Sequence, residues 1–336
     1  MREAGVELLQ GLKRLDAVGV PGPMTIANGI LNIFTMKRFF KAQALDVVVF
    51  VDNPSLNLRL ARIAARFGHR VIYYIGPQIW AWGRRRIHLI KRLVRRMIVI
   101  LPFEEAIYRD AGVPCNFVGH PLLDTLEPHY DRQKVRKQLG LSEKGLIIGV
   151  LPGSRLSEVQ PLLPEMIQAV KKMKAFDPDV QCVIGQAQSI SNDCLEGLID
   201  REELPVTVVA NRTNEVMAAA DLLLVASGTA TLQAALVGTP MIITYRLSWL
   251  TYHIAKRIAS VKHLGLVNLV AGGGIVPELL QEDATAQRLY EEAVSLLKDH
   301  DRYHHMEETF QSIRQQMGAP GASDRAAEVV LAECQA

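Results

Sequence analysis

Short apolar runs alternate with helix-like patterns along most of the chain. A run that is apolar at every position, rather than at every second one, is typical of a strand in a parallel sheet covered on both faces. Such runs occur at residues 46–51, 70–75, 97–101, 115–118, 146–151, 180–184, 206–209, 222–225 and 241–245. The segments between them, such as 56–67 and 103–111, have apolar residues at helical spacing. This alternation predicts an α/β fold with parallel sheets.

A polar stretch at residues 124–144 interrupts the alternation. We therefore place a domain boundary near residues 125–143 and predict two doubly wound, Rossmann-like domains, residues 1–125 and 143–318, facing each other across a cleft. A last helix within residues 319–336 is expected to pack back toward the first domain. Ligands of such sheets bind beyond the carboxyl ends of the strands, so the residues that follow the strands matter most.

Charge is distributed unevenly along the chain. The net charge is only +3, but residues 53–103 contain 11 Lys and Arg and no Asp or Glu. This segment predicts a strongly positive surface, which suits anionic lipid, phosphate or nucleic acid. The four cysteines form no C-x-x-C pair, which indicates reduced thiols in the cytoplasm. No apolar run approaches the ~18 residues of a membrane span, and the start lacks the layout of a secretory signal.

Residues 26–40 (IANGILNIFTMKRFF) are apolar and aromatic and end among basic residues. Two interpretations stay open. The segment is either a core helix or an interfacial amphipathic helix that dips into a bilayer. In the second interpretation, Phe39 and Phe40 contact the membrane.

Two loops rich in small residues follow predicted strands and precede helices. The first reads LPGSR (151–155), in which Gly153 permits a tight turn and Arg155 offers a permanently charged, forked donor to a phosphate. The second reads ASGTAT (226–231), where Ser227 or Thr229 are also suited to cap a helix. Two such loops in one domain favour a diphosphate site over simple turns.

Two further loops belong to the first half of the chain. Asp52 ends the strand at 46–51, where a carboxylate can deprotonate a sugar hydroxyl; a helix N-cap is the equal alternative on spacing alone. Residues 76–82 (GPQIWAW) precede Arg84, Arg85 and Arg86, a combination that suits a phosphorylated lipid or a membrane interface. Nucleic-acid binding competes, but we discount it because the other motifs indicate a diphosphate. Residues 177–179 (DPD) precede a strand, so we interpret them as a turn and expect no metal site.

These motifs, taken together and in order, resemble the lipid-A-disaccharide synthase family over nearly the whole chain. The runs that carry the resemblance are GPQIWAW (76–82), PFE (102–104), FVGHPL (117–122), LPGSR with Glu158 (151–158), ASGTATLQ (226–233), MIITYR (241–246), LTYHIAKR (250–257) and the stretch from VNLVAG to VPELLQ (267–281). The resemblance implies the glycosyltransferase-B architecture and a role in lipid A biosynthesis.

The resemblance also implies an activity. The family transfers 2,3-diacylglucosamine from its UDP derivative to 2,3-diacylglucosamine 1-phosphate, with inversion, to form a β-1,6-linked disaccharide 1-phosphate and UDP. We therefore expect a cytoplasmic enzyme, peripheral on the inner face of the inner membrane and bound to its anionic surface. We expect no cofactor and no nucleic-acid partner, and a homodimer stays open.

Carried over residue by residue, Asp52 matches the family's essential acidic residue and Asn268 the asparagine of its P-N-L-L motif. The residues expected to bind the UDP-sugar are Gly153, Ser154, Arg155, Glu158, Ser227, Gly228, Thr229, Ala230, Thr231, Gln233, Arg246 and Asn268. The residues expected to contact the acceptor lipid or the membrane are Phe39, Phe40, Asn57, Trp80, Trp82, Arg84, Arg85 and Arg86.

The chain departs from the family pattern at three positions and at its start. Ser55 replaces a second Asp, Gln233 replaces a Glu and Val267 replaces a Pro. Family members also begin with a strand, a G-E-A-S-G-D loop and a helix before the segment that matches residues 1–6. We expect a chain extended upstream by about 40–60 residues, one βα unit with its loops, to be more stable and more active.

Two alternatives stay open at this point. The first is another UDP-sugar enzyme of the same architecture, such as a UDP-N-acetylglucosamine 2-epimerase or the peptidoglycan glucosaminyltransferase. The second is a non-catalytic binder of UDP or lipid, which Ser55, Gln233 and the shortened start favour.

Overall fold

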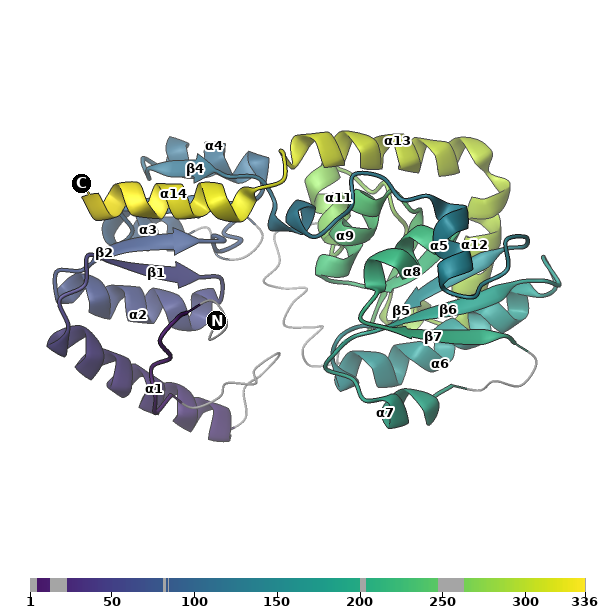
Figure 1. Cartoon of the computed structure of the whole chain (residues 1–336), viewed down its shortest axis with the longest axis horizontal. Coiled ribbons are helices and arrows are strands. Elements are labelled where there is room, and N and C mark those ends of the chain that lie inside the picture. The colour runs from purple at the N-terminus through teal and green to yellow at the C-terminus, as the bar shows by residue number, and fades with distance from the viewer. Residues whose placement is uncertain are drawn as a thin grey trace. The chain divides into compact units, whose positions relative to one another are not determined.

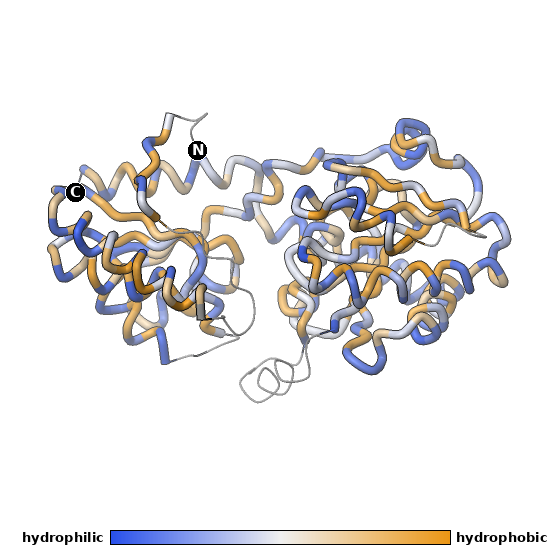
Figure 2. Tube along the Cα trace, turned by 90° about the horizontal axis from the view of Figure 1, so that it is seen from below, coloured by the Kyte–Doolittle hydropathy of each residue, from blue (hydrophilic) through white to orange (hydrophobic). Residues whose placement is uncertain are grey.

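A computed structural model describes residues 5–12, 23–80, 83, 85–199, 204–246 and 263–335, which form two compact units (Figure 1). The first unit holds the described residues up to Pro121 together with those from Ala319 onward, and the second begins at Leu122. Residues 126–142, which sequence analysis placed between the domains, therefore belong to the second unit. The tube in Figure 2 shows that each unit has apolar strands at its centre and polar segments around them.

The first unit contains a parallel sheet in the order β1-β2-β3-β4. Its strands are β1 (Val47–Val51), β2 (Arg70–Tyr74), β3 (Arg96–Val99) and β4 (Cys115–Phe117). Its helices are α1 (Pro23–Ala42), α2 (Pro54–Arg66), α3 (Arg86–Leu93), α4 (Pro102–Asp110) and α14 (Ala322–Gln335). Because the strands follow chain order and crossovers are right-handed, the helices α2, α3 and α4 cover the same face of the sheet.

Two apolar layers bury the two faces of this sheet. On the helix-covered face, Tyr73 and Met97 pack with Tyr108 of α4. On the other face, Ile72 and Ile98 pack against α14, which Figure 1 shows in yellow on the opposite side of the sheet from α2. Among the described residues, β1 pairs with β2 alone.

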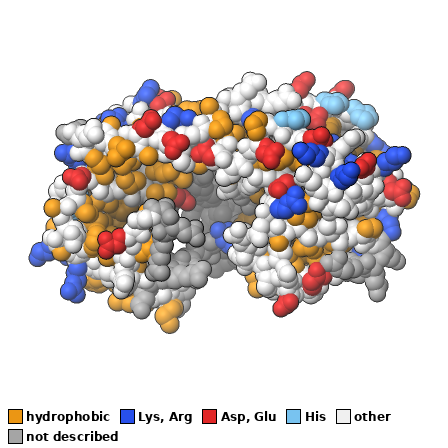
Figure 3. All heavy atoms as spheres, viewed as in Figure 1, with side chains coloured by type: hydrophobic (Ala, Val, Ile, Leu, Met, Phe, Trp, Pro, Cys, Tyr) orange, Lys and Arg blue, Asp and Glu red, His pale blue; other side chains and the backbone are white. Residues whose placement is uncertain are grey.

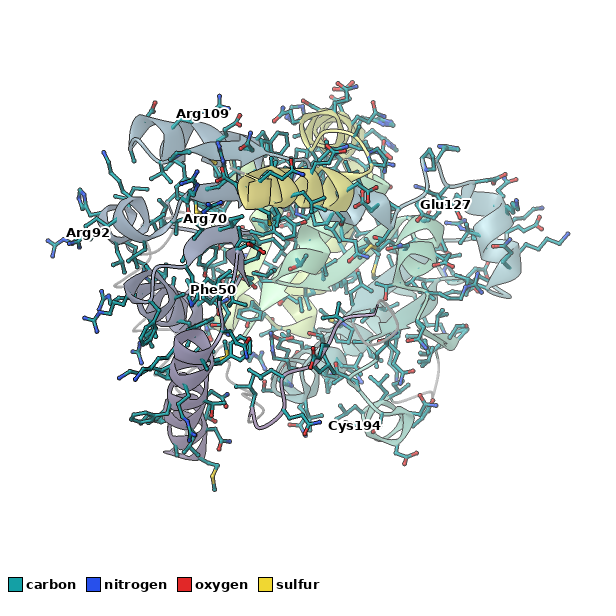
Figure 4. The ribbon with its side chains drawn as sticks, turned by 60° about the vertical axis from the view of Figure 1, so that its left-hand side comes forward. Phe50, Arg70, Arg92, Arg109, Glu127 and Cys194 are labelled. Carbon is teal, nitrogen blue, oxygen red and sulfur yellow. The ribbon has the colours of Figure 1, made fainter. Side chains whose placement is uncertain are left out.

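Charged side chains fix α14 to this sheet. The carboxylate of Glu333 accepts hydrogen bonds from Arg95 at 2.5 Å and from Arg96 at 2.8 Å. Arg70, labelled in Figure 4, donates to the Glu333 carbonyl oxygen at 2.8 Å. The last helix of the chain therefore completes the core of the first unit.

The second unit contains a six-stranded parallel sheet in the order β10-β9-β8-β5-β6-β7. Its strands are β5 (Ile147–Leu151), β6 (Gln181–Gln186), β7 (Val206–Ala210), β8 (Leu222–Ala226), β9 (Met241–Tyr245) and β10 (Glu278–Leu280). Its helices are α5 (Arg132–Gln138), α6 (Leu156–Met173), α7 (Asn192–Glu196), α8 (Thr213–Ala219), α9 (Thr229–Val237), α11 (Leu266–Ala271), α12 (Ala286–Lys298) and α13 (His300–Gln316), with 3-10 turns η2 (Pro121–Asp124) and η3 (Gln281–Asp283).

The order of this sheet reverses beside β5. The chain runs outward from β5 through β6 to β7 and then returns to β8 on the other side of β5. Consequently α6 lies on one face of the sheet, and α8 and α9 lie on the other (Figure 1). The carboxyl ends of β5 and β8 form the switch point at which ligands of such sheets bind.

The two parallel α/β sheets predicted from the apolar runs are confirmed. One strand, β10, was not predicted, and its sequence is only ELL. An apolar run this short cannot be told from a turn, so its pairing with β9 is visible only in the folded chain.

Candidate functional site

A cavity of about 490 Å³ lies in the second unit at the carboxyl ends of β5 and β8. Its size is within the range of small-molecule sites. It is lined by Leu151, Gly153, Ser154, Arg155, Glu158, Gly185, Ala187, Thr213, Ala226, Ser227, Gly228, Thr229, Ala230 and Gln233. The structure therefore brings both loops of small residues to one site.

The first loop places Glu158 beneath Arg155 and Ser154. Gly153 has a φ of 119°, and a Cβ atom there would lie 2.6 Å from a Glu158 carboxylate oxygen, so only glycine fits. The Ser154 amide donates to that carboxylate at 3.1 Å, and Arg155 donates to it at 2.7 Å. Tyr245 also shares a hydrogen bond with Glu158, and burial followed by the charge of this carboxylate raises the Tyr245 pKa. Glu158 thus holds Arg155, whose remaining N–H groups suit an anion, at the start of α6.

The second loop enters α9 without a side-chain cap. Gly228 is the N-cap residue, and the Ser227 hydroxyl donates to the Leu264 carbonyl instead, at 3.2 Å. The alternative that Ser227 or Thr229 caps this helix is therefore wrong. Thr231 needs a correction as well, because its hydroxyl bonds the Gly228 carbonyl at 2.8 Å and its side chain is fully buried away from the cavity.

Two other residues predicted to bind the UDP-sugar have structural roles in the second unit. Arg246 donates to the Ala284 carbonyl at 2.7 Å and does not line the cavity. Asn268 is fully buried; its amide donates to Val276 O and to Glu278, each at 2.8 Å, and its oxygen accepts from Val276 N. Because all its polar atoms are engaged, Asn268 holds the loop before β10 in this structure.

Several residues that line this cavity were not predicted from the sequence. Gly185 lies within β6, Ala187 follows that strand, and Thr213 begins α8. Ala187 and Thr213 follow strands β6 and β7, which was the available signal, but neither belongs to a loop with recognisable chemistry. The cavity wall also includes Gln233, whose amide nitrogen donates to Asn214 Oδ1 at 2.5 Å.

In the first unit, Asp52 directly follows β1 and is exposed to solvent. Asp52 has a φ of 50°, and Ile75, just after β2, has a φ of 59°. Positive φ values are unusual for residues other than glycine, and such backbone strain occurs often at functional sites. The Asp52 carbonyl oxygen accepts from Tyr73 Oη and from Asn57 Nδ2, each at 2.7 Å. Burial and then the Asp52 charge raise the Tyr73 pKa, so this hydroxyl stays a donor.

Two sequence predictions at this loop now have an answer. Asn53, not Asp52, is the N-cap residue of α2, so the capping interpretation of Asp52 is wrong. Asn57 was expected to contact the acceptor lipid, but its amide nitrogen donates to the carbonyl oxygens of Val51 and Asp52. Asn57 therefore holds the strand end that carries Asp52.

Trp80 forms one wall of an apolar cavity of about 460 Å³. Its indole nitrogen donates to Glu104 at 3.0 Å, and its ring meets Phe103 edge-on at 5.1 Å. Burial raises the pKa of Glu104 to about 7. The cavity is lined by Ile79, Trp80, Ile87, Ile107, Asp110 and Ala111. Arg85 and Arg86 are exposed at the start of α3, whereas Trp82 and Arg84 lie outside the described residues.

Burial contradicts the membrane contact predicted for Phe40, whereas the side chain of Phe39 is only partly buried. Phe40 is only 2% exposed, and Phe39 packs against the same core. The exposed apolar side chains of α1 lie earlier in the helix, at Met24, Ile26, Ile30, Leu31 and Phe34. Figure 3 shows further apolar side chains gathered on the visible face of the first unit.

A basic groove of about 410 Å³ lies between α2 and α3. Its floor is apolar, formed by Ala65, Leu89 and Leu93, and its rim carries Arg62, Arg66 and Arg92. Figure 4 shows Arg92 pointing away from the molecule. Within the described ranges, no helix is long and apolar enough to cross a membrane.

Residues 177–179 form a turn, as predicted. The Asp177 carboxylate accepts from the amides of Leu146 at 3.1 Å and of Asp179 at 2.9 Å. The part of the chain that the structure describes contains no group of three or more His, Cys, Asp or Glu that could hold a metal ion.

Two parallel α/β units, with a cavity at the switch point of the second, define the glycosyltransferase-B architecture. The chain is similar to MurG from Acinetobacter baumannii, with a TM-score of 0.56 and 15% identity over 95% of this chain and 84% of that one. It is also similar to the UDP-GlcNAc 2-epimerase from Neisseria meningitidis, crystallised with UDP-GlcNAc, with a TM-score of 0.60 and 12% identity over 96% of this chain and 84% of that one.

The particular family follows from sequence. The family model for lipid-A-disaccharide synthetase matches residues 1–332. The chain is 38% identical to the lipid-A-disaccharide synthase of Nitrosococcus oceani, over 99% of this chain and 86% of that protein. It is 40% identical to that of Trichlorobacter lovleyi, over 98% of this chain and 87% of that protein. The chain belongs to the lipid-A-disaccharide synthase family and is a glycosyltransferase.

Proposed function

We propose that this chain transfers 2,3-diacylglucosamine from its UDP derivative to 2,3-diacylglucosamine 1-phosphate. The product is the β-1,6-linked disaccharide 1-phosphate, and UDP is released. The observation that carries the proposal is the cavity of the second unit, where two small-residue loops and Arg155 converge in a chain of this family.

The cavity supplies what a nucleoside diphosphate needs. Glycine at 153 and 228 lets the backbone approach a ligand closely, and the start of α6 offers amides and a positive dipole end to phosphate oxygens. Arg155, whose side chain is 49% exposed, is held at one side of the cavity by Glu158 and adds a permanent charge. UDP is therefore the ligand we assign to this unit.

Asp52 is the residue we assign as general base. The 6-hydroxyl oxygen of the acceptor attacks the anomeric carbon of the donor sugar as the bond from that carbon to UDP breaks. The hydroxyl proton passes to the Asp52 carboxylate, and the electron pair leaves with UDP. One displacement of this kind inverts the anomeric centre. Tyr73 and Asn57 support the assignment by fixing the backbone that carries the carboxylate.

The first unit offers features for an acylated substrate and an anionic membrane surface. The exposed apolar side chains of α1, including Ile30 and Phe34, suit insertion at the bilayer interface. The groove between α2 and α3 joins an apolar floor to a basic rim, which suits anionic lipid. Trp80 and its apolar cavity are the contact we propose for an acyl chain. We place the enzyme at the cytoplasmic face of the inner membrane.

UDP release from both acylated glucosamine substrates in detergent micelles tests the proposal. We expect UDP and the lipid disaccharide in equal amounts, and neither when the acceptor is left out. UDP-N-acetylglucosamine without lipid serves as the control. Soluble product from that control would identify an epimerase, and UDP binding without turnover would identify a non-catalytic binder; either result would contradict the proposal.

A further inference from the structure

Two hydrogen-bonded side-chain amides, those of Gln233 and Asn214, lie in line behind the cavity wall of the second unit. Gln233, on α9, lines the cavity, and its Nε2 donates to Asn214 Oδ1 at 2.5 Å. Asn214, on α8, in turn donates from Nδ2 to the carbonyl oxygen of Thr125 at 3.1 Å. Both amide side chains are half-buried.

The Thr125 carbonyl determines the direction of both hydrogen bonds that link Thr125, Asn214 and Gln233. A carbonyl oxygen accepts and never donates, so Asn214 must present its NH₂ group to Thr125. Its oxygen must then face Gln233, which has to donate with its own NH₂ group. The Gln233 oxygen Oε1 and the second N–H of Nε2 remain, and among the described residues no group donates a hydrogen bond to Oε1.

The position of Gln233 indicates which part of a nucleotide meets this oxygen. Gln233 lies one helical turn after Thr229 and Ala230, in the loop assigned to the diphosphate. Phosphate oxygens accept hydrogen bonds, so a carbonyl oxygen does not suit them. The group next to the diphosphate in UDP is the ribose, whose hydroxyls donate.

We propose that Asn214 is a positioning residue, which orients the Gln233 amide so that Oε1 accepts a hydrogen bond from a ribose hydroxyl. This inference rests on the proposed binding of UDP. It assigns a role in nucleotide selectivity to a residue outside the cavity. It also explains how an uncharged side chain at position 233 presents an acceptor of fixed direction.

A second Gln–Asn pair in the same unit provides a matched control. Gln186 Nε2 donates to Asn192 Oδ1 at 2.7 Å, in the same donor and acceptor sense. Neither residue lines the cavity. Asn192→Ala therefore removes the same kind of hydrogen bond without affecting the proposed acceptor.

The experiment measures equilibrium binding of UDP, 2′-deoxy-UDP and 3′-deoxy-UDP to the full chain by calorimetry. One neutral hydrogen bond corresponds to about three- to tenfold in affinity. We expect the wild type to prefer UDP by that factor over at least one deoxy analogue. Asn214→Ala should reduce the preference to less than about twofold, because it lowers the affinity for UDP and leaves the affinity for the deoxy analogue unchanged. Asn192→Ala should keep the preference.

Two further variants separate orientation from simple stability. Asn214→Asp still accepts from Gln233 but cannot donate to Thr125, so it should retain most of the preference. Gln233→Met keeps the side-chain size without the amide and should lose the preference, which tests the inference even if Asn214→Ala does not fold. If Asn214 has a purely structural role, its substitution should lower the affinities for UDP and for the deoxy analogues by equal factors.

The outcomes distinguish this inference from the proposed function. A wild type that binds no UDP overturns the proposed function and this inference with it. A wild type that binds UDP but does not prefer it, or an Asn214→Ala variant that keeps the preference, overturns the role of Asn214 alone.

Discussion

At the scale of single residues, Arg155 contributes the permanent charge of the cavity. A charge-assisted hydrogen bond is worth about 1.5–3 kcal/mol, so Arg155→Ala should lower kcat/KM for the UDP-sugar by about ten- to a hundredfold. Arg288→Ala is the control, because it removes an ion pair with the same i, i+3 spacing on α12, away from the cavity. Steady-state kinetics test this, and near-wild-type values for purified Arg155→Ala would remove Arg155 from the site.

Asp52 is tested by a change that keeps its shape. The hydrogen bonds that Asp52 makes with other described residues use its backbone atoms, so Asp52→Asn should preserve the loop and UDP binding. Because an amide cannot take up the acceptor proton, we expect turnover to fall by about 10²–10⁴-fold. Asp46→Asn, just before the opposite end of β1, is the control. Collapse of UDP affinity with normal turnover at saturation would assign Asp52 to binding.

Glu104 makes stability depend on pH in a predictable direction. Burial raises its pKa from 4.5 to about 7, so the folded state holds this proton more tightly than the unfolded state. Its stabilisation is complete below about pH 4.5 and is lost as pH rises to about 7, a change of about 3 kcal/mol.

Glu104→Gln removes this titration and can still accept from Trp80. We expect its melting temperature to exceed that of the wild type at pH 8 and the difference to shrink toward pH 4.5. Glu308→Gln, at an exposed position of α13, should show no such trend. A difference that stays constant over this pH range would exclude Glu104 as the titrating group.

At the scale of elements, α14 depends on Glu333. Burial alone would raise the pKa of this carboxyl, but hydrogen bonds from Arg95 and Arg96, together with their charges, lower it. The stabilisation is therefore present above the ordinary pKa of 4.5 and is lost as pH falls through the lowered value. Because Arg95 and Arg96 are 49% and 34% exposed, solvent screens the pair and the expected cost of Glu333→Gln is about 1–2 kcal/mol at pH 7.

Hydrogen exchange in α14 and in β3 measures this cost locally. Protection should fall in both elements and remain unchanged in the second unit. Glu328→Gln, at an exposed position of the same helix, should change neither. Equal protection in Glu333→Gln and wild type at pH 7 would show that apolar packing alone holds the helix.

At the scale of the whole molecule, association with membranes combines charge and apolar insertion. Each Arg near an anionic surface contributes about 1 kcal/mol, so Arg62→Gln with Arg66→Gln should weaken binding to anionic vesicles by about ten- to thirtyfold at low salt. The loss should fade as salt screens the charges. Ile30→Ser with Phe34→Ser should weaken binding at every ionic strength.

Vesicle sedimentation at several salt concentrations measures both contributions. Leu331→Ser is the control, because Leu331 is 60% exposed on α14, which covers the other face of the first sheet. Binding that ignores both salt and these substitutions would exclude α1 and the basic groove as the contact surface.

Local sequence patterns were enough to predict the two parallel sheets, every strand of the described residues except β10, and the two loops of small residues at the cavity. An apolar run predicts a buried strand, because burial of a strand requires apolar side chains at several consecutive positions. Gly153, Arg155 and Gly228 were found for a similar local reason, since tight turns after strands need glycine and leave specific donors at helix starts. All three line the cavity in the folded chain.

The direction and the contacts of individual side chains could not be predicted from local sequence and became visible in the folded chain. Phe34 and Phe40 lie on one helix, yet Phe34 is 60% exposed and Phe40 is 2% exposed. Asn268 fits a binding motif, but its side-chain amide donates hydrogen bonds to Val276 and Glu278. Such partners come from elements that meet only after folding, as Glu333 meets Arg95, and no local pattern of residues encodes that meeting.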